Sequence, residues 1–308
     1  EQRRPMDPLG ALLSVFGLGS ILYAIIEAPT HGWMSNETFG VAALGVLLMV
    51  AFVTWERRVE HPLLPMGLFG DRGFTIGLMA IMFAFFVMFS FMFTQMLHFQ
   101  LVRDKTALEA AIRFLPLPLG LGPVAANSDR LVQRFGSRNV VTTGLALVSL
   151  GMALFTTVDV GTAYPVIGAT FLLLGVGMGL TMAPSTTLVM DAVPDDKAGV
   201  GSATNDASRE IGGALGIAIG GSVLNEYYQR SMSIPEGLEH LGSVPLESFP
   251  AAMRIGGEML AEGNMAGLEL IEAARASFVE GMVASAMVGG TIALATAFVV
   301  RSYMPGRD

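Results

Sequence analysis

The sequence predicts an all-α membrane protein that crosses the bilayer several times, as three observations indicate. Hydrophobic residues make up 52% of its 308 residues, charged residues make up only 14%, and the mean hydropathy is +0.59. An average soluble domain carries about 25% charged residues. Uncharged runs of about 20 residues recur along the chain, and a run of that length crosses a bilayer as a helix.

Charged residues, prolines and glycines divide the apolar sequence into eight expected spans. They cover approximately residues 8–28, 37–55, 74–98, 108–128, 139–157, 163–190, 199–225 and 276–302. The third is rich in Phe and Met, and the sixth is rich in glycine ahead of Pro184. The fourth contains three prolines between residues 116 and 123, so a kink or a local opening is expected there.

Lys and Arg residues in the loops predict the orientation. If the first span begins on the cytoplasmic side, eleven Lys and Arg residues lie in cytoplasmic segments and three lie in the short external connections. Both ends of the chain are therefore expected in the cytoplasm. The acidic segment 226–275 becomes an external loop with some helical pattern. It either covers the outer mouth of the protein or is a solvated spacer.

The seventh span contains three ionisable residues in the stretch NDASREIGGALGIAIGG, residues 205–221. A charge in hydrocarbon is costly, so Asp206, Arg209 and Glu210 are expected to point into the bundle or a water-filled cavity. Arg209 can neutralise only part of two carboxylates, which leaves one to be protonated or to meet a cation. This favours a proton-titrating or cation-contacting site at the two acids. A structural Asp–Arg pair, or charges solvated at the cytoplasmic end, is the alternative.

The remaining residues of this span predict how its helix is packed. Small residues share a face with the charges and recur every four positions, so another helix is expected to approach closely there. The helix-packing candidates are Gly212, Gly213, Gly216, Gly220 and Gly221. The residues on the opposite side, which are expected to face lipid, are Ile211, Leu215 and Ala218.

Aromatic and thioether side chains on the third span are candidates for lining a cavity, because they adapt to varied apolar ligands. Those with helical spacing along one face are Phe85, Phe89, Met92 and Met96. A stripe that faces lipid is the other interpretation. Gln95 and His98 are polar candidates near the external end of this span. Arg113, on the fourth span, either snorkels to the interface or contacts an anionic group.

The sequence lacks the patterns of an enzyme or a nucleic-acid-binding protein. It contains no nucleophile elbow, no nucleotide-binding fingerprint, no His cluster with metal-ligand spacing and no basic patch. Cys is absent, which excludes disulfides and thiolate metal sites. No cofactor is expected, and transport would draw its energy from an ion gradient.

Three stretches carry a family resemblance: WERRVEHPLLPMGLFGDRGF (55–74), SDRLVQRFGSRNVVTTG (128–144) and GIAIGG (216–221). Together they resemble the major facilitator superfamily, in particular its fourteen-helix drug:proton antiporter branch, often called EmrB/QacA-like. The first resembles the connection that precedes the second six-helix domain. The second is similar to a degenerate copy of a cytoplasmic gating motif, and the third is similar to the tail of the antiporter motif, with Ile217 replacing a Pro.

The resemblance implies a division of the chain. Residues 1–73 would hold two extra central transmembrane helices and their cytoplasmic connection, and residues 74–308 would be the C-terminal six-helix domain of a major facilitator fold. Six further helices would precede Glu1, and this missing N-terminal half would be a partner alongside the lipid bilayer. The implied gating residues are Arg130, Arg134, Gly136 and Arg138.

The function implied by the resemblance is proton-coupled efflux of small hydrophobic or cationic drugs across a bacterial inner (plasma) membrane by alternating access. Asp206 and Glu210 would serve in coupling or substrate recognition, and no nucleic acid would take part. Export of an endogenous lipid, siderophore or secondary metabolite is an alternative. An alternative of another class is a membrane scaffold or sensor that does not transport.

Overall fold

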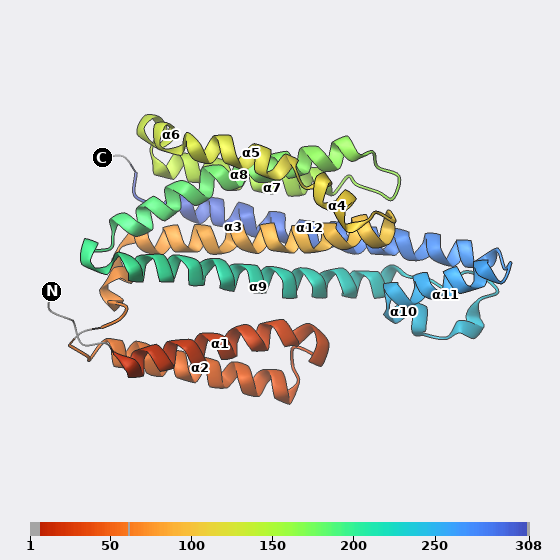
Figure 1. Cartoon of the computed structure of the whole chain (residues 1–308), viewed down its shortest axis with the longest axis horizontal. Helices are drawn as coiled ribbons and strands as arrows, with labels where there is room; N and C mark the ends of the chain where they lie inside the picture. The colour runs from red at the N-terminus through yellow and green to blue at the C-terminus, as the bar shows by residue number, and fades with distance from the viewer. Residues whose placement is uncertain (1–6, 61, 307–308) are drawn as a thin grey trace.

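The computed structural model describes residues 7–60 and 62–306, and within these ranges all regular structure is helical (Figure 1). The long helices are α1 (Pro8–His31), α2 (Asn36–Glu56), α3 (Arg72–Leu97), α7 (Ser137–Phe155), α8 (Tyr164–Asp191), α9 (Ala198–Ser231) and α12 (Ala266–Tyr303). The shorter ones are α4 (Ala107–Arg113), α5 (Pro116–Ala126), α6 (Ser128–Phe135), α10 (Val244–Glu247) and α11 (Phe249–Ala261). Single helical turns are η1 (Met66–Gly70), η2 (His98–Val102), η3 (Asp195–Lys197) and η4 (Glu239–Leu241). The predicted all-α class is confirmed.

Several helical segments are long and apolar enough to cross a membrane. In the described part of the chain there are seven: Pro8–Ala28, Asn36–Glu56, Arg72–Val102, Ala107–Ala126, Ser137–Phe155, Tyr164–Asp191 and Ala266–Tyr303. They coincide with seven of the eight expected spans, and the chain is a multi-pass membrane protein. The other expected span, 199–225, lies within α9, whose charged and small residues make it less apolar than the rest. The count of eight membrane crossings therefore stays a prediction.

The fourth expected span is interrupted. The helix α4 ends at Arg113, and α5 begins at Pro116 after a short break. Proline has no N–H to donate to the preceding turn and its ring crowds that turn, so a continuous helix is disfavoured at this point. The kink expected from the prolines is confirmed.

The acidic segment 226–275 is mostly helical. It contains the end of α9, the short α10, all of α11 and the beginning of α12. The Tyr228 hydroxyl donates to the carbonyl of Pro245 at 2.7 Å, and the rings of Phe249 and Phe278 lie 4.5 Å apart. These contacts hold α10 and α11 against the ends of α9 and α12, so a solvated spacer does not describe this segment.

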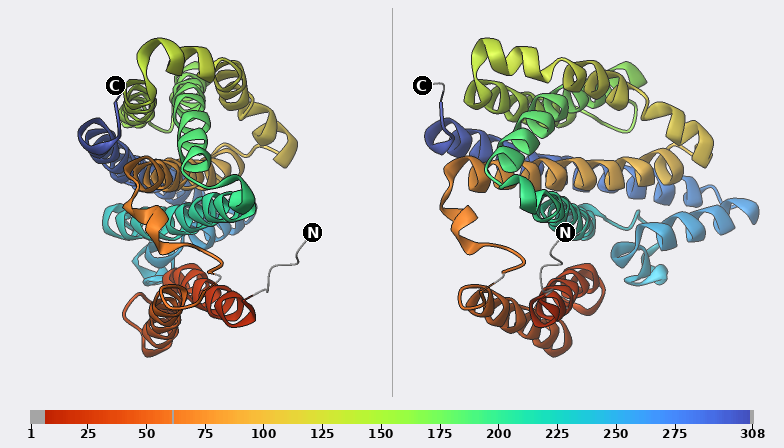
Figure 2. Two further views of the ribbon diagram at one scale, coloured as in Figure 1. Left: turned by 90° about the vertical axis from the view of Figure 1, so that its left-hand side faces the viewer. Right: turned by 60° about the vertical axis from the view of Figure 1, so that its left-hand side comes forward.

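The helices run along one common axis (Figures 1 and 2). α3 contacts α8, α9 and α12, while α5 and α7 pack against α8. α1 and α2 lie side by side, and α1 contacts α9. The start of α1 and the end of α12 lie at the same end of the bundle, as does the connection between α8 and α9 (Figure 1). We refer to this as the inner end, in keeping with the orientation that the loop charges predict.

Candidate functional site

A groove of about 690 Å³ lies between α9, α3, α1 and the segment around α10 and α11. Its α9 side runs from Arg209 to Tyr228, which is about 28 Å of helix at 1.5 Å per residue. Its walls are mostly apolar, with Phe89, Phe93 and Leu22 among the lining side chains. The charged residues that line the groove lie toward its two ends. The groove can therefore hold an elongated apolar molecule with a polar or charged group.

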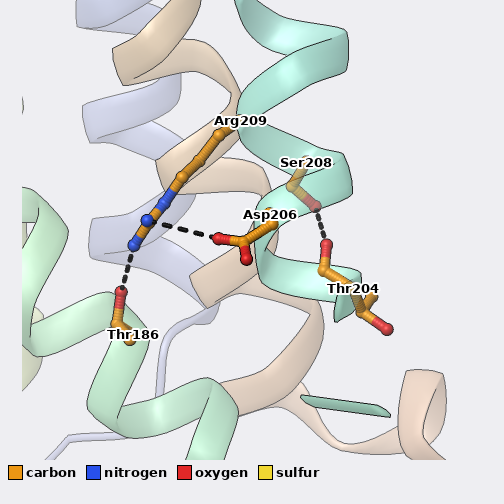
Figure 3. A network of polar contacts seen from close by, with 5 residues as sticks. All are labelled: Thr186, Thr204, Asp206, Ser208 and Arg209. Atoms are coloured by element: carbon orange, nitrogen blue, oxygen red, sulfur yellow. Dashed lines mark hydrogen bonds and ion pairs between the residues drawn. The ribbon is translucent and has the colours of Figure 1, made fainter. Parts of the chain in front are cut away.

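Arg209 joins three helices at the inner part of the groove (Figure 3). Its Nη1 donates to Oδ1 of Asp206 at 3.3 Å, and its Nη2 donates to Oγ1 of Thr186 on α8 at 3.4 Å. The guanidinium also lies over the ring of Phe85 on α3, 5.5 Å from the ring centroid. These contacts hold the positive charge of Arg209 in place between α9, α8 and α3.

Asp206 and Glu210 differ in their surroundings. Asp206 pairs with Arg209, its side chain is 63% exposed, and it does not line the groove. Such exposed pairs one turn apart on a helix contribute only about 0.3–0.5 kcal/mol. Glu210 is also exposed, but it lines the groove, and its side chain forms no hydrogen bond or salt bridge within the described ranges. Glu210 is therefore the α9 acid that faces the groove without a compensating partner, and Glu247 lies toward the other end of the groove.

The aromatic and polar candidates of the third span lie on different sides of α3. Phe89 lines the groove and stacks with Phe85 at 5.9 Å. Met92 and Met96 are half-buried and pack against the core of the bundle. Gln95 is fully buried, 3.4 Å from His98. Of this set, only Phe89 borders the groove.

Arg113 lies away from the groove, on α4. Its Nη1 donates to the carbonyl of Glu109 at 2.8 Å, and its guanidinium lies 6.0 Å from the ring centroid of Tyr164. The Tyr164 hydroxyl in turn donates to the carbonyl of Arg113 at 3.0 Å. These contacts join α4 to the start of α8.

Several groove residues have no counterpart among the candidates drawn from the sequence. On α3 and the following η2 these are Phe93, Leu97 and Leu101, and toward the outer end they include Asn225, Tyr228 and Glu247. The first three continue from Phe89 at intervals of four, a signal that the sequence does contain. The outer-end residues become neighbours only because α10 folds back on α9.

The five helix-packing glycines of α9, at positions 212, 213, 216, 220 and 221, lie along α3. A methyl group built on Gly212 or Gly216 would overlap the backbone carbonyl of Met82 or Phe86. At Gly220 it would meet the side chain of Ser90, and the other two glycines face aromatic rings of α3. Close contact between α9 and α3 therefore depends on the absence of side chains.

The prediction that Ala218 faces lipid is wrong, because this residue is only 3% exposed. Ile211 and Leu215, expected on the same side, are partly buried. The helix α9 is contacted by α3, α12 and α1, so less of its surface faces outward than a helix at the edge of a bundle would expose.

The gating candidates surround α6 at the inner end. Arg130 donates to the Asn127 side chain at 3.4 Å, and the guanidinium of Arg134 lies 5.2 Å from the ring centroid of Phe135. Gly136 has φ of 79°, a conformation that favours glycine, and it joins α6 to α7. The Arg138 Nε donates to the carbonyl of Met304 at 2.7 Å, which connects the start of α7 with the end of α12.

In the residues that the structure describes, no three His, Cys, Asp or Glu side chains meet as possible ligands of a metal ion. The titratable side chains of the groove are scattered along it, with Arg209 and Glu210 toward one end and Glu247 toward the other. The arrangement suits recognition of a charged amphiphile or transfer of a proton.

Comparison with known proteins identifies the family. The model of the Major Facilitator Superfamily matches residues 6–217. The chain is 28% identical to Multidrug resistance protein Stp of Mycobacterium tuberculosis over 97% of its length, and to Multidrug efflux pump LfrA of Mycolicibacterium smegmatis over 96%. It is 31% identical to Drug efflux pump JefA of Mycobacterium tuberculosis over 71% of its length.

The matched regions cover 57% of Stp, 58% of LfrA and 43% of JefA, so the match spans little more than half the length of the first two relatives and less than half of the third. The family match covers more than half of the chain, and the helical, multi-pass architecture agrees with it. The chain belongs to the major facilitator superfamily, whose members are membrane transporters and not enzymes.

Proposed function

We propose that the chain is the C-terminal part of a multidrug efflux transporter that exchanges protons for small hydrophobic or cationic compounds. The observation that carries this proposal is the apolar groove faced by the unpaired carboxylate of Glu210. Three relatives that are named as drug resistance or drug efflux proteins support it. The comparisons favour neither the export of a natural metabolite nor a scaffold that does not transport.

In this proposal, residues 74–308 form one six-helix domain, residues 1–73 supply two linker helices, and another six-helix half belongs to the same transporter. The groove opens alternately to the two sides of a bacterial inner membrane, with both ends of this segment in the cytoplasm. Glu210 binds either a proton or the cationic group of a substrate, so that entry of one favours release of the other. The proton gradient supplies the energy, and no bound cofactor is needed.

Arg209 has a supporting role in the same scheme. Its contacts with Asp206 and Thr186 hold a positive charge next to the groove without pairing it to Glu210. Because α8 supplies Thr186, a movement of α9 relative to α8 changes the distance between this charge and the groove. The candidate gating residues at α6 lie at the same inner end. Arg138 also lies there, and its hydrogen bond to Met304 connects α7 to α12.

Substitutions in the complete transporter test this function. Glu210→Gln is expected to lower proton-dependent efflux of a cationic dye at least about tenfold, since a difference of about 1.4 kcal/mol in one step suffices for that factor. Asp206→Asn is expected to have a smaller effect, because Asp206 lies outside the groove and is paired with Arg209. Dye efflux is measured in inverted membrane vesicles with and without an imposed proton gradient.

Glu226→Gln is the matched control, because Glu226 is an acid of the same helix that pairs with Arg230 at the outer end and does not line the groove. Its efflux is expected to equal that of the unmodified transporter. Unchanged efflux in both Glu210→Gln and Asp206→Asn would overturn the assignment of the site.

A further inference from the structure

Two carboxylates outside the groove lie together at the inner end of the bundle, where α1 begins and α2 ends. Asp7 is 7% exposed and Glu56 is 3% exposed. A methyl group built on Gly10 would lie 2.6 Å from Oδ2 of Asp7 and 2.6 Å from Oε1 of Glu56. The two oxygens therefore lie on either side of one point at Gly10, no more than twice this distance apart, and any larger residue at this position would collide with both.

Hydrogen-bond donors are distributed unequally between the two acids. Asp7 accepts on both oxygens, from the backbone N–H of Gly10 at 2.9 Å and from Nε1 of Trp55 at 2.8 Å. Glu56 accepts on Oε2 from the backbone N–H of Leu64 at 2.9 Å, and the backbone N–H of Leu63 also acts on its carboxylate. Its Oε1 is buried and has no hydrogen-bond partner. Donors stabilise an ionised carboxylate, so the surroundings favour the charge on Asp7 and leave Oε1 of Glu56 uncompensated.

Among the described residues, one cation faces the pair from another element, and Arg3 and Arg4 lie outside the described residues. Lys197 of η3 is close enough to act on Glu56, but its Nζ donates to the carbonyl of Pro62 at 3.4 Å. Arg57 and Arg58, which follow Glu56 in the chain, are exposed. Throughout the described ranges, no salt bridge to Asp7 or Glu56 is formed. Two carboxylates that share a buried site without a paired cation do not both ionise, because the charges repel each other.

We infer that Asp7 and Glu56 form a proton-binding site in the linker helices. Glu56 holds the proton on Oε1 and donates it to the ionised carboxylate of Asp7, which gives the unpartnered oxygen a partner and closes a bridge between α1 and α2. Leu64 ties the same glutamate to the chain that leads to α3. Release of the proton leaves two repelling carboxylates, so the attachment of the linker helices to the rest of the bundle depends on pH at the inner end.

This site is separate from the groove, since neither carboxylate lines it. It also rests on contacts that the efflux scheme does not use. A test that observes the proton directly can therefore fail or succeed independently of whether Glu210 couples transport.

Infrared spectroscopy of the full chain in lipid bilayers detects the proton through the carbonyl stretch of a protonated carboxylic acid. A band of this kind is expected at neutral pH and is expected to disappear in Glu56→Gln. Glu60→Gln is the matched control, because Glu60 is an exposed acid four residues further along, and it is expected to keep the band. Asp7→Asn removes the ionised acceptor and is expected to shift the band without abolishing it.

A second measurement covers the case in which a variant folds poorly. Glu56→Gln carries an amide donor in place of the acid proton, so its thermal unfolding midpoint is expected to stay constant between neutral and alkaline pH, where that of the unmodified chain falls. A carbonyl band that is identical in Glu56→Gln and the unmodified chain would overturn the inference. Loss of the band when sodium or potassium is added at constant pH would also overturn the inference, because the site would then bind a metal cation.

Discussion

Arg209 keeps the two acids of α9 in different electrostatic environments. Its pairing with Asp206 and its contact with Thr186 leave its positive charge beside Glu210 without neutralising that acid. In Arg209→Gln this charge is removed, and binding of a cationic probe to the groove is expected to tighten about threefold, since loss of a screened repulsion of about 0.7 kcal/mol has that effect. A neutral probe of similar size is expected to bind as before. Fluorescence titration of the purified transporter with both probes measures the difference.

The control for this prediction is Arg230→Gln, because Arg230 is paired with Glu226 on the outer part of the same helix and does not line the groove. It is expected to change neither affinity. If Arg209→Gln altered the binding of both probes equally, a loss of helix packing would explain the result better than a loss of charge.

Single residues of the groove were only partly predictable from the sequence. The residues predicted to line a cavity continue from Phe89 to Met92 and Met96. The residues that line the groove continue from Phe89 to Phe93 and Leu97 instead. Both stripes have helical spacing and both are apolar, so periodicity does not separate them. Which of two adjacent faces borders open space depends on where α9 and α1 pack against α3, and these contacts join segments that are distant in the sequence.

The element α9 depends on its glycines for contact with α3. Gly216→Ala places a methyl group against the backbone carbonyl of Phe86, which cannot move without displacing α3, so a loss of about 1–3 kcal/mol in stability is expected. Gly199→Ala lies on the same helix with no neighbouring atom in reach, and it is expected to stabilise the protein by up to about 1 kcal/mol through helix propensity. Thermal unfolding in detergent measures both. Equal effects of the two substitutions would contradict close packing at position 216.

Helical elements were predictable to within a few residues where they are continuous and apolar. The bounds of α2 and α7, for example, lie within two residues of the expected spans. In segment 226–275 the sequence predicted some helical pattern but no helix bounds, because α11 is amphipathic and its charged residues exclude it from the apolar runs that mark the spans. Its position depends on contacts such as that between Phe249 and Phe278, which no local pattern reveals.

At the scale of the whole molecule, the groove belongs to one half of the transporter that we propose. The chain alone is expected to insert into a membrane and to give no proton-dependent efflux, because alternating access needs a second six-helix domain. Co-expression with a six-helix N-terminal half of the same transporter is expected to restore efflux. Dye accumulation in cells that lack their own drug exporters measures both. Efflux by the 308-residue chain alone would contradict the proposal.

The sequence predicted the overall architecture more reliably than the internal packing. Apolar runs predicted the multi-pass class, which the structure confirms. The start of α1 and the end of α12 lie at one end of the bundle (Figure 1), while the count of eight crossings and the orientation in the membrane stay predictions. The contact of α1 with α9 could not be predicted. It depends on pairs such as Trp33 and Ser222, whose side chains are 3.0 Å apart although the residues are far apart in the sequence.

The α1–α2 pair also contains both tryptophans of the chain. Trp33 lies at its outer end beside Ser222, and Trp55 lies at its inner end with its indole N–H on Asp7. Tryptophan emission of this chain, excited at wavelengths that tyrosine does not absorb, therefore originates entirely from the α1–α2 pair. In a Trp33→Phe or Trp55→Phe variant of this chain, a single tryptophan remains, and its emission reports movement of these two helices without an attached dye.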